Sequence, residues 1–325
     1  MIRYIAERTV QGLIVIAVMS FVIYGLIGLM PGDPIDLMIS ANPNLTAEDA
    51  ARLREIQGLD RPILERYAAW AMSALQGDFG YSRTYAQPVL DVLGPRLANT
   101  AALMIAAFVM ALAIGLPAGI YAGSRPGSVP DALINLASFV SISTPTFWLA
   151  LMMIMLFAVI LGWLPASGLP TGPASLGEQI RHLILPVTTL AVVEAGAYAR
   201  YMRAAMIDAL QHDYVRTARA KGAGRTRVVL AHALRNAMVP VVTIMALSFG
   251  ALFSGALVTE TMFAYPGMGK LIFDAVMGND FNLALVALLF ATALTLVGNL
   301  VADLAYAALD PRISYGRGPG AGRAP

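Results

Sequence analysis

Long intervals without a charged side chain constrain this sequence more than any other feature. Crossing a bilayer core about 30 Å thick takes about 20 residues of helix at a rise of about 1.5 Å per residue. Five uncharged intervals exceed that length, and they are residues 9–32, 97–124, 132–177, 236–259 and 281–302. Only 13% of the 325 residues are charged and 58% are hydrophobic, so we expect lipid to surround most of the chain.

Two parts of the pattern need interpretation before the spans can be counted. The interval 132–177 is too long for one span and its later part, 163–173, is rich in turn residues, so we expect one helix over about 133–162. A further span is expected over about 183–202, although this run contains Glu194 and Arg200. The sequence therefore predicts an all-α membrane protein with about six transmembrane helices.

The distribution of positive charge predicts the orientation. With six helices, both termini and the loops 123–132 and 201–236 share one side of the membrane. That side holds 14 of the 22 Lys and Arg residues when Arg200 is counted with its loop, whereas the short loops opposite hold two, Arg181 and Lys270. Short cytoplasmic loops are enriched in positive charge, so both termini are predicted to be cytoplasmic, in a bacterial inner membrane.

The first apolar stretch is expected to remain as a membrane helix. It is longer than the core of a secretory signal, which is about 7 to 15 residues, and no small-residue cleavage pattern follows it.

The segment 31–96 is the one sizeable part predicted to lie outside the cell. Its charges nearly balance, with nine acidic and six basic residues, so we expect it to fold. A helix start is predicted at Thr46, and Leu64, Tyr67 and Met72 indicate a second short helix. The segment can cap the membrane helices, present a docking face to a partner, or do both.

The loop between the fourth and fifth predicted spans carries the most specific local signals. Asp213 can cap the start of a short helix, Lys221 suits its last turn, and Gly222 can supply the left-handed residue that ends it. We therefore predict a helix of about nine residues, roughly 13 Å long, within the cytoplasmic loop 203–236.

The composition of this short helix allows two interpretations. Its basic flank, Arg216, Arg219 and Lys221, is compatible with a solvated loop that follows the positive-inside rule. The small side chains of Ala218 and Ala220 would also let a groove on another protein grip the helix closely. The charges fit both interpretations. A solvated loop does not explain the combination of a helix and a terminal glycine, but the residues alone leave both interpretations open.

Residues 214–222 (Tyr-Val-Arg-Thr-Ala-Arg-Ala-Lys-Gly), with 232–236 (His-Ala-Leu-Arg-Asn) and Val239-Pro240, resemble a known signature. It is the cytoplasmic loop of binding-protein-dependent ATP-binding-cassette permeases, nearest to the first permease subunit of the dipeptide, oligopeptide and nickel branch. In that family the short helix is a coupling helix, which sits in a cleft of the ATPase subunit and passes nucleotide-driven motion to the membrane helices. By this resemblance the ATPase-docking residues are Tyr214, Val215, Arg216, Thr217, Ala218, Arg219, Ala220, Lys221 and Gly222.

The match has departures. Thr217, Ala218 and Gly222 fit the family motif, but Arg216 stands where the motif has glutamate. The distance from Gly222 to Pro240 also differs from the general pattern and favours the peptide branch.

Other stretches resemble the same family in the expected order along the chain. They are residues 31–34 (Pro-Gly-Asp-Pro), 77–82 (Gly-Asp-Phe-Gly-Tyr-Ser), 144–148 (Thr-Pro-Thr-Phe-Trp), 260–269 (Glu-Thr-Met-Phe-Ala-Tyr-Pro-Gly-Met-Gly) and 309–312 (Leu-Asp-Pro-Arg).

The resemblance implies a type I ABC importer permease fold and a set of partners. A second related permease subunit, two ATP-binding subunits and an extracytoplasmic solute-binding protein would complete the complex, the last docking near 31–96 and the 260–282 loop. ATP and Mg would be bound by the ATPase subunits, so no cofactor is expected in this chain. The implied substrates are di- and oligopeptides, with nickel, glutathione or sugars handled by related branches.

The expected division of the chain has four parts. Residues 1–30 form the N-terminal segment and first membrane helix, 31–96 the extracytoplasmic segment, 97–312 the permease core, and 313–325 a flexible tail.

Glu194 is an acidic residue inside a predicted span, where it usually faces protein or water. It can line the path for the amino terminus of a peptide, or form a pair with Arg200 or Arg203 near the cytoplasmic interface.

Two sequence features, a glycine repeat and prolines within apolar runs, are typical of membrane helices that pack closely or kink. Small residues that repeat every four positions let helices approach, and they are Gly115, Gly119 and Gly123. Pro117 and Pro145 lie within apolar runs and permit kinks, and Thr144 and Ser141 could satisfy freed carbonyls.

The sequence lacks the motifs of several other classes. It has no cysteine, no H-E-x-x-H metal motif, no nucleophile elbow and no phosphate-binding loop, so we expect neither an enzyme nor a metal site. The competing hypothesis is a self-contained secondary transporter or channel, which would carry paired polar residues near the midplane and an internal repeat.

Overall fold

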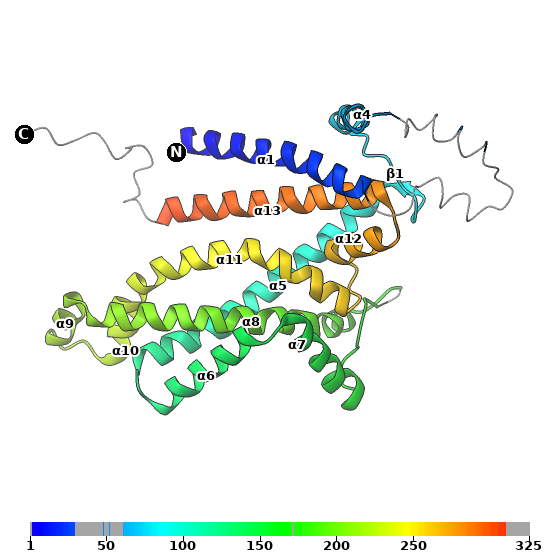
Figure 1. Cartoon of the computed structure of the whole chain (residues 1–325). Coiled ribbons are helices and arrows are strands. Elements are labelled where there is room, and N and C mark those ends of the chain that lie inside the picture. Colours follow the sequence, from blue (N-terminus) through cyan, green and yellow to red (C-terminus); the bar gives the residue numbers. More distant parts are fainter. Residues whose placement is uncertain (1, 30–47, 49–51, 53–60, 171, 310–325) are drawn as a thin grey trace, which may run out of the picture. The chain divides into compact units, whose positions relative to one another are not determined.

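The computed structural model describes residues 2–29, 48, 52, 61–170 and 172–309, and within these ranges it is helical apart from one short hairpin (Figure 1). Five helices are long and apolar enough to cross a membrane, or six if one bent pair counts as a span. The candidate spans are Ala6–Gly28 within α1 (Ile2–Gly28), α5 (Val89–Ser124), α8 (Leu176–Gln211), Arg225–Met245, and Phe281–Leu300 within α13 (Phe281–Leu309). These confirm the predicted all-helical membrane fold, including the span that contains Glu194.

The third predicted span is not one straight helix. It divides into α6 (Val129–Ser143) and α7 (Thr146–Met153), which continues as the π-helix η1 (Ile154–Ile160), and the two parts are bent by 102°. The break falls at Pro145, which has no N–H to donate. The Thr144 hydroxyl donates to the carbonyl of Val140 at 2.7 Å, but that carbonyl also accepts from the Thr144 amide at 3.1 Å, so it is not an acceptor freed by Pro145.

The chain forms two compact units. The larger comprises Ala101–Tyr265 with the chain from Thr295 onward, and the smaller comprises Ile2–Thr100 with Pro266–Leu294. The predicted boundaries at residues 30, 96 and 312, and the predicted cytoplasmic termini, stay predictions. The predicted helix start at Thr46 and the predicted tail 313–325 lie outside the described residues.

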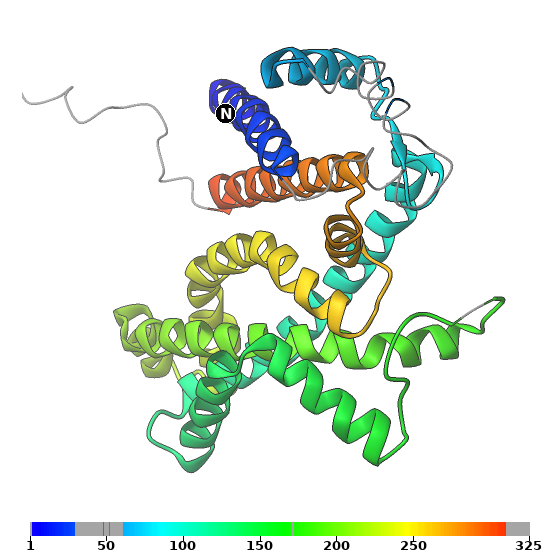
Figure 2. The ribbon, with the colours of Figure 1, turned by 45° about the vertical axis from the view of Figure 1, so that its right-hand side comes forward.

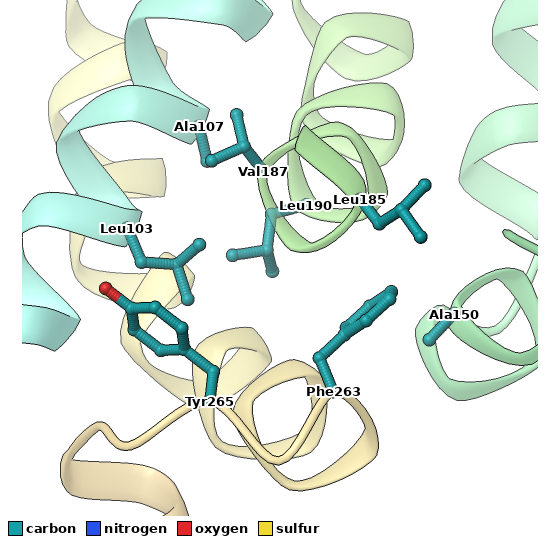
Figure 3. Close-up of a cluster of buried hydrophobic side chains, with 8 residues drawn as sticks. All are labelled: Leu103, Ala107, Ala150, Leu185, Val187, Leu190, Phe263 and Tyr265. Atoms are coloured by element: carbon teal, nitrogen blue, oxygen red, sulfur yellow. The ribbon is translucent and has the colours of Figure 1, made fainter. Parts of the chain in front are cut away.

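A buried apolar cluster holds one end of the larger unit together. It joins α5, α7, α8 and the turn that follows α11 (Leu234–Met262), and Figure 3 shows two aromatic rings from that turn directed at the leucines of α5 and α8. The turn needs the positive φ of 46° at Ala264, between Phe263 and Tyr265, and the Tyr265 amide donates to the Glu260 carbonyl at 2.8 Å. The family-like stretch 260–269 therefore serves here to place Phe263 and Tyr265 in the core.

Three glycines on α5 press directly on the backbone of α8. A Cβ added at Gly115, Gly119 or Gly123 would come within 2.6 to 2.7 Å of an α8 carbonyl oxygen, closer than real contacts allow. The three oxygens belong, in turn, to Ala195, Ala199 and Arg203. The predicted close approach along this stripe is confirmed, with α8 as the partner helix.

The smaller unit is built around a buried carboxylate. It contains α4 (Ile63–Leu75), the hairpin of β1 (Tyr81–Ser82) and β2 (Gln87–Pro88), α12 (Met268–Met277) and the first half of α13. Asp280, which is 1% exposed, accepts hydrogen bonds from the Ser82 hydroxyl at 2.5 Å and the Thr84 amide at 2.9 Å. The helix α4 confirms the second short helix predicted from residues 64–72.

Candidate functional site

The short helix predicted in the loop between spans four and five is present as α9 (Asp213–Ala220). It begins one residue differently from the prediction, because His212, with φ −72° and ψ 154°, occupies the N-cap position and makes no side-chain cap hydrogen bond. Asp213 is the first helical residue, where its carboxylate still favours the positive end of the helix dipole. The Arg216 guanidinium pairs with that carboxylate at 3.2 Å.

The end of α9 matches the prediction closely. Gly222 has a φ of 81°, in the left-handed region that favours glycine. The Gly222 amide donates to the Arg219 carbonyl at 2.9 Å and the Ala223 amide to the Ala218 carbonyl at 3.1 Å. This is the pair of hydrogen bonds of a Schellman motif, which satisfies carbonyls left free at a helix end.

The two faces of α9 differ sharply. Val215 and Ala218 are buried, and they pack with Val228 in a small apolar cluster. Ala218 is therefore turned toward its own chain, so the expectation that both Ala218 and Ala220 would face an outside groove is wrong for Ala218. The exposed residues of α9 are Asp213, Arg216, Thr217, Arg219 and Ala220, and Lys221 at the C-cap is exposed as well.

The apolar cluster and one hydrogen bond attach α9 to the membrane helices. Val228 begins the π-helix η2 (Val228–Ala233), which continues into α11, while α9 follows α8 through His212. Arg225, in the short helix α10 (Arg225–Arg227), donates from Nη2 to the Ser124 carbonyl at the end of α5, at 2.9 Å. Movement of α9 must therefore act on the ends of α5, α8 and α11 together.

A buried ion pair between α6 and α8 was not predicted from the sequence. Asp131 on α6 is 3% exposed, and it accepts from Nε and Nη2 of Arg203 on α8 at 2.5 and 2.9 Å. It also accepts from the Gly127 amide at 2.9 Å and from Asn135 at 3.0 Å. A sequence signal existed, because Asp131 is the only acidic residue in the 123–132 loop.

This arrangement removes one interpretation of Glu194. Arg203 forms its ion pair with Asp131, and the Arg200 guanidinium lies over the ring of Phe139 with its Cζ 4.7 Å from the ring centroid. Within the described part of the chain no salt bridge includes Glu194, so the predicted pair with Arg200 or Arg203 is wrong. Glu194 is half-buried on α8 and interacts with the side chain of Tyr198, one turn further on.

The described residues contain no group of three or more His, Cys, Asp or Glu side chains that could hold a metal ion.

Comparison with known proteins assigns the family. Residues 115–315 match the model of the binding-protein-dependent transport system inner membrane component, and residues 1–104 match the N-terminal model of the same transport system membrane component. The chain belongs to this family. It is thus the membrane-embedded, non-catalytic permease subunit of an ABC importer, and it works with a binding protein and an ATPase.

The permease is similar to curated proteins over nearly its whole length. It is 39% identical to a putative peptide permease protein of Brucella ovis, with 96% of this chain and 99% of that protein covered. It is 37% identical to the oligopeptide transport system permease protein AppB of Bacillus subtilis, with 97% and 100% covered. It is 38% identical to the glutathione transport system permease protein GsiC of Escherichia coli, again with 97% and 100% covered.

Solved structures support the fold of the permease. The MetNI methionine ABC transporter matches with a TM-score of 0.53 at 20% identity, covering 65% of this chain and 93% of that chain. An amino acid ABC transporter matches with a TM-score of 0.52 at 17% identity, covering 67% and 94%. At these identities the likeness concerns the fold alone.

Proposed function

We propose that the permease lines a translocation path for di- and oligopeptides delivered by an extracytoplasmic solute-binding protein. The observation that carries this proposal is its 37 to 39% identity, over essentially the full length of each chain, to proteins named for peptide, oligopeptide and glutathione transport. Glutathione is itself a tripeptide, so all three names describe peptide cargo. A second related permease subunit and two ATP-binding subunits complete the proposed complex.

The test is uptake by the purified complex in proteoliposomes. Labelled oligopeptide should accumulate only with the binding protein present and ATP available to the ATPase subunits. Uptake by the permease alone, driven by an ion gradient, would instead indicate a secondary transporter and would contradict the proposal.

We further propose that α9 is the contact through which the ATPase moves the permease. Its outward face presents Arg216, Thr217 and Ala220, and its inward face is fixed by the Val215 and Val228 contact. Because the inward face of α9 is packed against its own chain, a force applied by a partner to the exposed face would move the helix rather than deform it. The residues 214–222 therefore divide into those that would touch the ATPase and those that hold the helix in place.

A bulky substitution on the outward face separates docking from folding. Ala220→Trp should leave membrane insertion and yield intact but prevent copurification of the ATPase, since the tryptophan stands between the helix and its cleft. Ala231→Trp is the matched control, because Ala231 is also exposed but lies on η2. Normal copurification and uptake with Ala220→Trp would refute docking through this face.

We propose that Glu194 faces the translocation path, where its carboxylate meets the amino terminus of a peptide. Two observations support this: it is only half-buried, and it has no ionic partner among the described residues. A carboxylate within a span is costly unless it faces protein or water. Glu194→Gln should lower uptake while the yield of folded complex is kept. A loss of yield with normal uptake per molecule would assign it a structural role.

A further inference from the structure

The helix α4 has an apolar stripe that nothing in the described part of the chain covers. Leu64, Met72 and Leu75 are 65%, 58% and 83% exposed, and Ala68 between them is exposed as well. The spacing of these four residues places them on one side of a helix with 3.6 residues per turn. The stripe is therefore continuous along the whole length of α4.

Contacts with α1 fix the depth at which α4 lies. The hydroxyl of Tyr67 is 2.7 Å from the hydroxyl of Ser20. Ser20 is eight residues inside the Gly28 end of α1, or about 12 Å at 1.5 Å per residue. Because Ala6–Gly28 is a candidate membrane span, a helix standing in water beyond the end of α1 could not reach Ser20.

An aromatic cluster extends the same contact. The ring of Tyr67 meets Phe21 at 5.2 Å, and the ring of Trp70 meets Tyr24 at 5.9 Å, both between ring centroids. Figure 1 looks nearly along α4 while α1 lies across the picture, and Figure 2 shows α4 from the side, so the two helices cross. If α1 runs through the bilayer, α4 lies along the bilayer surface.

The order of the contacts also shows which side of α4 faces the membrane interior. Tyr67 contacts Ser20, Phe21 and Tyr24, whereas the ring contact of Trp70 with α1 is with Tyr24, the residue of these three nearest the Gly28 end. On the helix surface, Tyr67 neighbours Leu64 and Ala71, whereas Trp70 neighbours Arg66 and Ser73. The apolar stripe is thus on the flank that points toward the middle of the bilayer. The flank with Arg66 and Ser73 points toward water, and Glu65, three residues before Ala68, lies between the two flanks.

We propose that α4 is an interfacial helix whose stripe, Leu64, Ala68, Met72 and Leu75, is covered by lipid acyl chains in the leaflet at the Gly28 end of α1. Under the predicted orientation this is the outer leaflet. Three observations agree on this occupant: the depth of the α1 contact, the direction of the stripe, and the apolar surface that α1 itself exposes, where Val18 is 56% exposed. Amphipathic helices of this kind lie about 5 to 10 Å inside the headgroup boundary. This proposal does not depend on the identity of the substrate.

This chain has no cysteine, so single cysteines introduced into it can carry spin labels, with the partner subunits used in cysteine-free form. Leu64→Cys and Met72→Cys report on the stripe, Ser73→Cys on the opposite flank, and Val18→Cys on a lipid-facing position of α1. The complete complex would be reconstituted in phosphatidylethanolamine and phosphatidylglycerol vesicles. Collision with oxygen, which concentrates in lipid, would then be compared with collision with a water-soluble nickel chelate.

The proposal predicts that the oxygen-to-nickel accessibility ratio at positions 64 and 72 equals that at position 18 and exceeds that at position 73 several-fold. High nickel accessibility at 64 and 72 would place the stripe in water and overturn the proposal. Low accessibility to both reagents would mean that a protein subunit covers the stripe, and it would overturn the proposal as well. Ala68→Cys provides a second reporter on the stripe if a labelled variant at 64 or 72 fails to assemble.

Discussion

The contact between α5 and α8 makes a quantitative prediction for Gly119. A Cβ at this position would lie 2.6 Å from both the Ala199 carbonyl oxygen and the Met202 Cβ. Neither atom belongs to the flexible end of a side chain, so the helices must separate to admit a methyl group. Overpacking of this kind costs about 1–3 kcal/mol, and we expect Gly119→Ala to reduce the stability of the permease by that amount.

The matched control is Gly12→Ala in α1. Nothing lies within 4 Å of a Cβ added there, so this substitution should be neutral or stabilise by up to about 1 kcal/mol, because alanine restricts the unfolded chain. The two variants should therefore differ by about 1–4 kcal/mol in the free energy of unfolding, at least about a fivefold difference in the ratio of folded to unfolded protein.

The measurement is equilibrium unfolding in mixed micelles, followed by tryptophan fluorescence as the fraction of denaturing detergent rises. If Gly119→Ala unfolds at the same midpoint as Gly12→Ala, the glycine stripe is not in close contact and the reasoning fails. A larger side chain at Gly119 should extend the trend, with leucine more damaging than alanine.

Three further substitutions test individual contacts. Asp131→Asn should lower the thermal unfolding midpoint, with a loss of about 1–3 kcal/mol, and adding Arg203→Gln should cost less than the sum of the single changes if the pair acts as a unit. Asp280→Asn should make the 77–88 hairpin more sensitive to protease, since a neutral amide oxygen accepts from the Ser82 hydroxyl and the Thr84 amide more weakly than the carboxylate oxygen that accepts from both; unchanged cleavage would contradict this. Gly222→Ala should weaken ATPase copurification through about 1–2 kcal/mol of left-handed backbone strain, with Gly222→Asn milder, and equal behaviour of the two variants would count against a conformational cause.

The spans could be predicted because the physics is local. A long interval without charge has few alternatives to a membrane helix, and the prediction holds even for α8, where Glu194 and Arg200 weakened the pattern. The missing N–H permitted a kink at both Pro117 and Pro145, and the break occurs at Pro145, whereas α5 continues through Pro117. The bend angle of 102° could not be predicted, since the angle depends on how α6 and α7 pack against other helices.

The site shows the same division between local and distant causes. Gly222 was identifiable because a helix end needs a left-handed residue, and one residue type suits it best. The inward direction of Ala218 could not be predicted, because the side chain that covers it is Val228, which lies beyond the turn. The pairing of Arg203 was missed for a similar reason: the sequence offered Glu194 on the same helix, whereas the true partner, Asp131, is 72 residues away.

The glycine contacts between α5 and α8 also limit how the permease can change shape. Gly115, Gly119 and Gly123 recur every four residues, so the next arrangement with glycines against the α8 carbonyls lies about 6 Å away along the axis, at 1.5 Å per residue. Any smaller displacement would drive a side chain into the opposing backbone. These two stretches are therefore expected to move as one rigid pair, so that a change of shape would tilt the pair as a whole rather than slide one helix along the other.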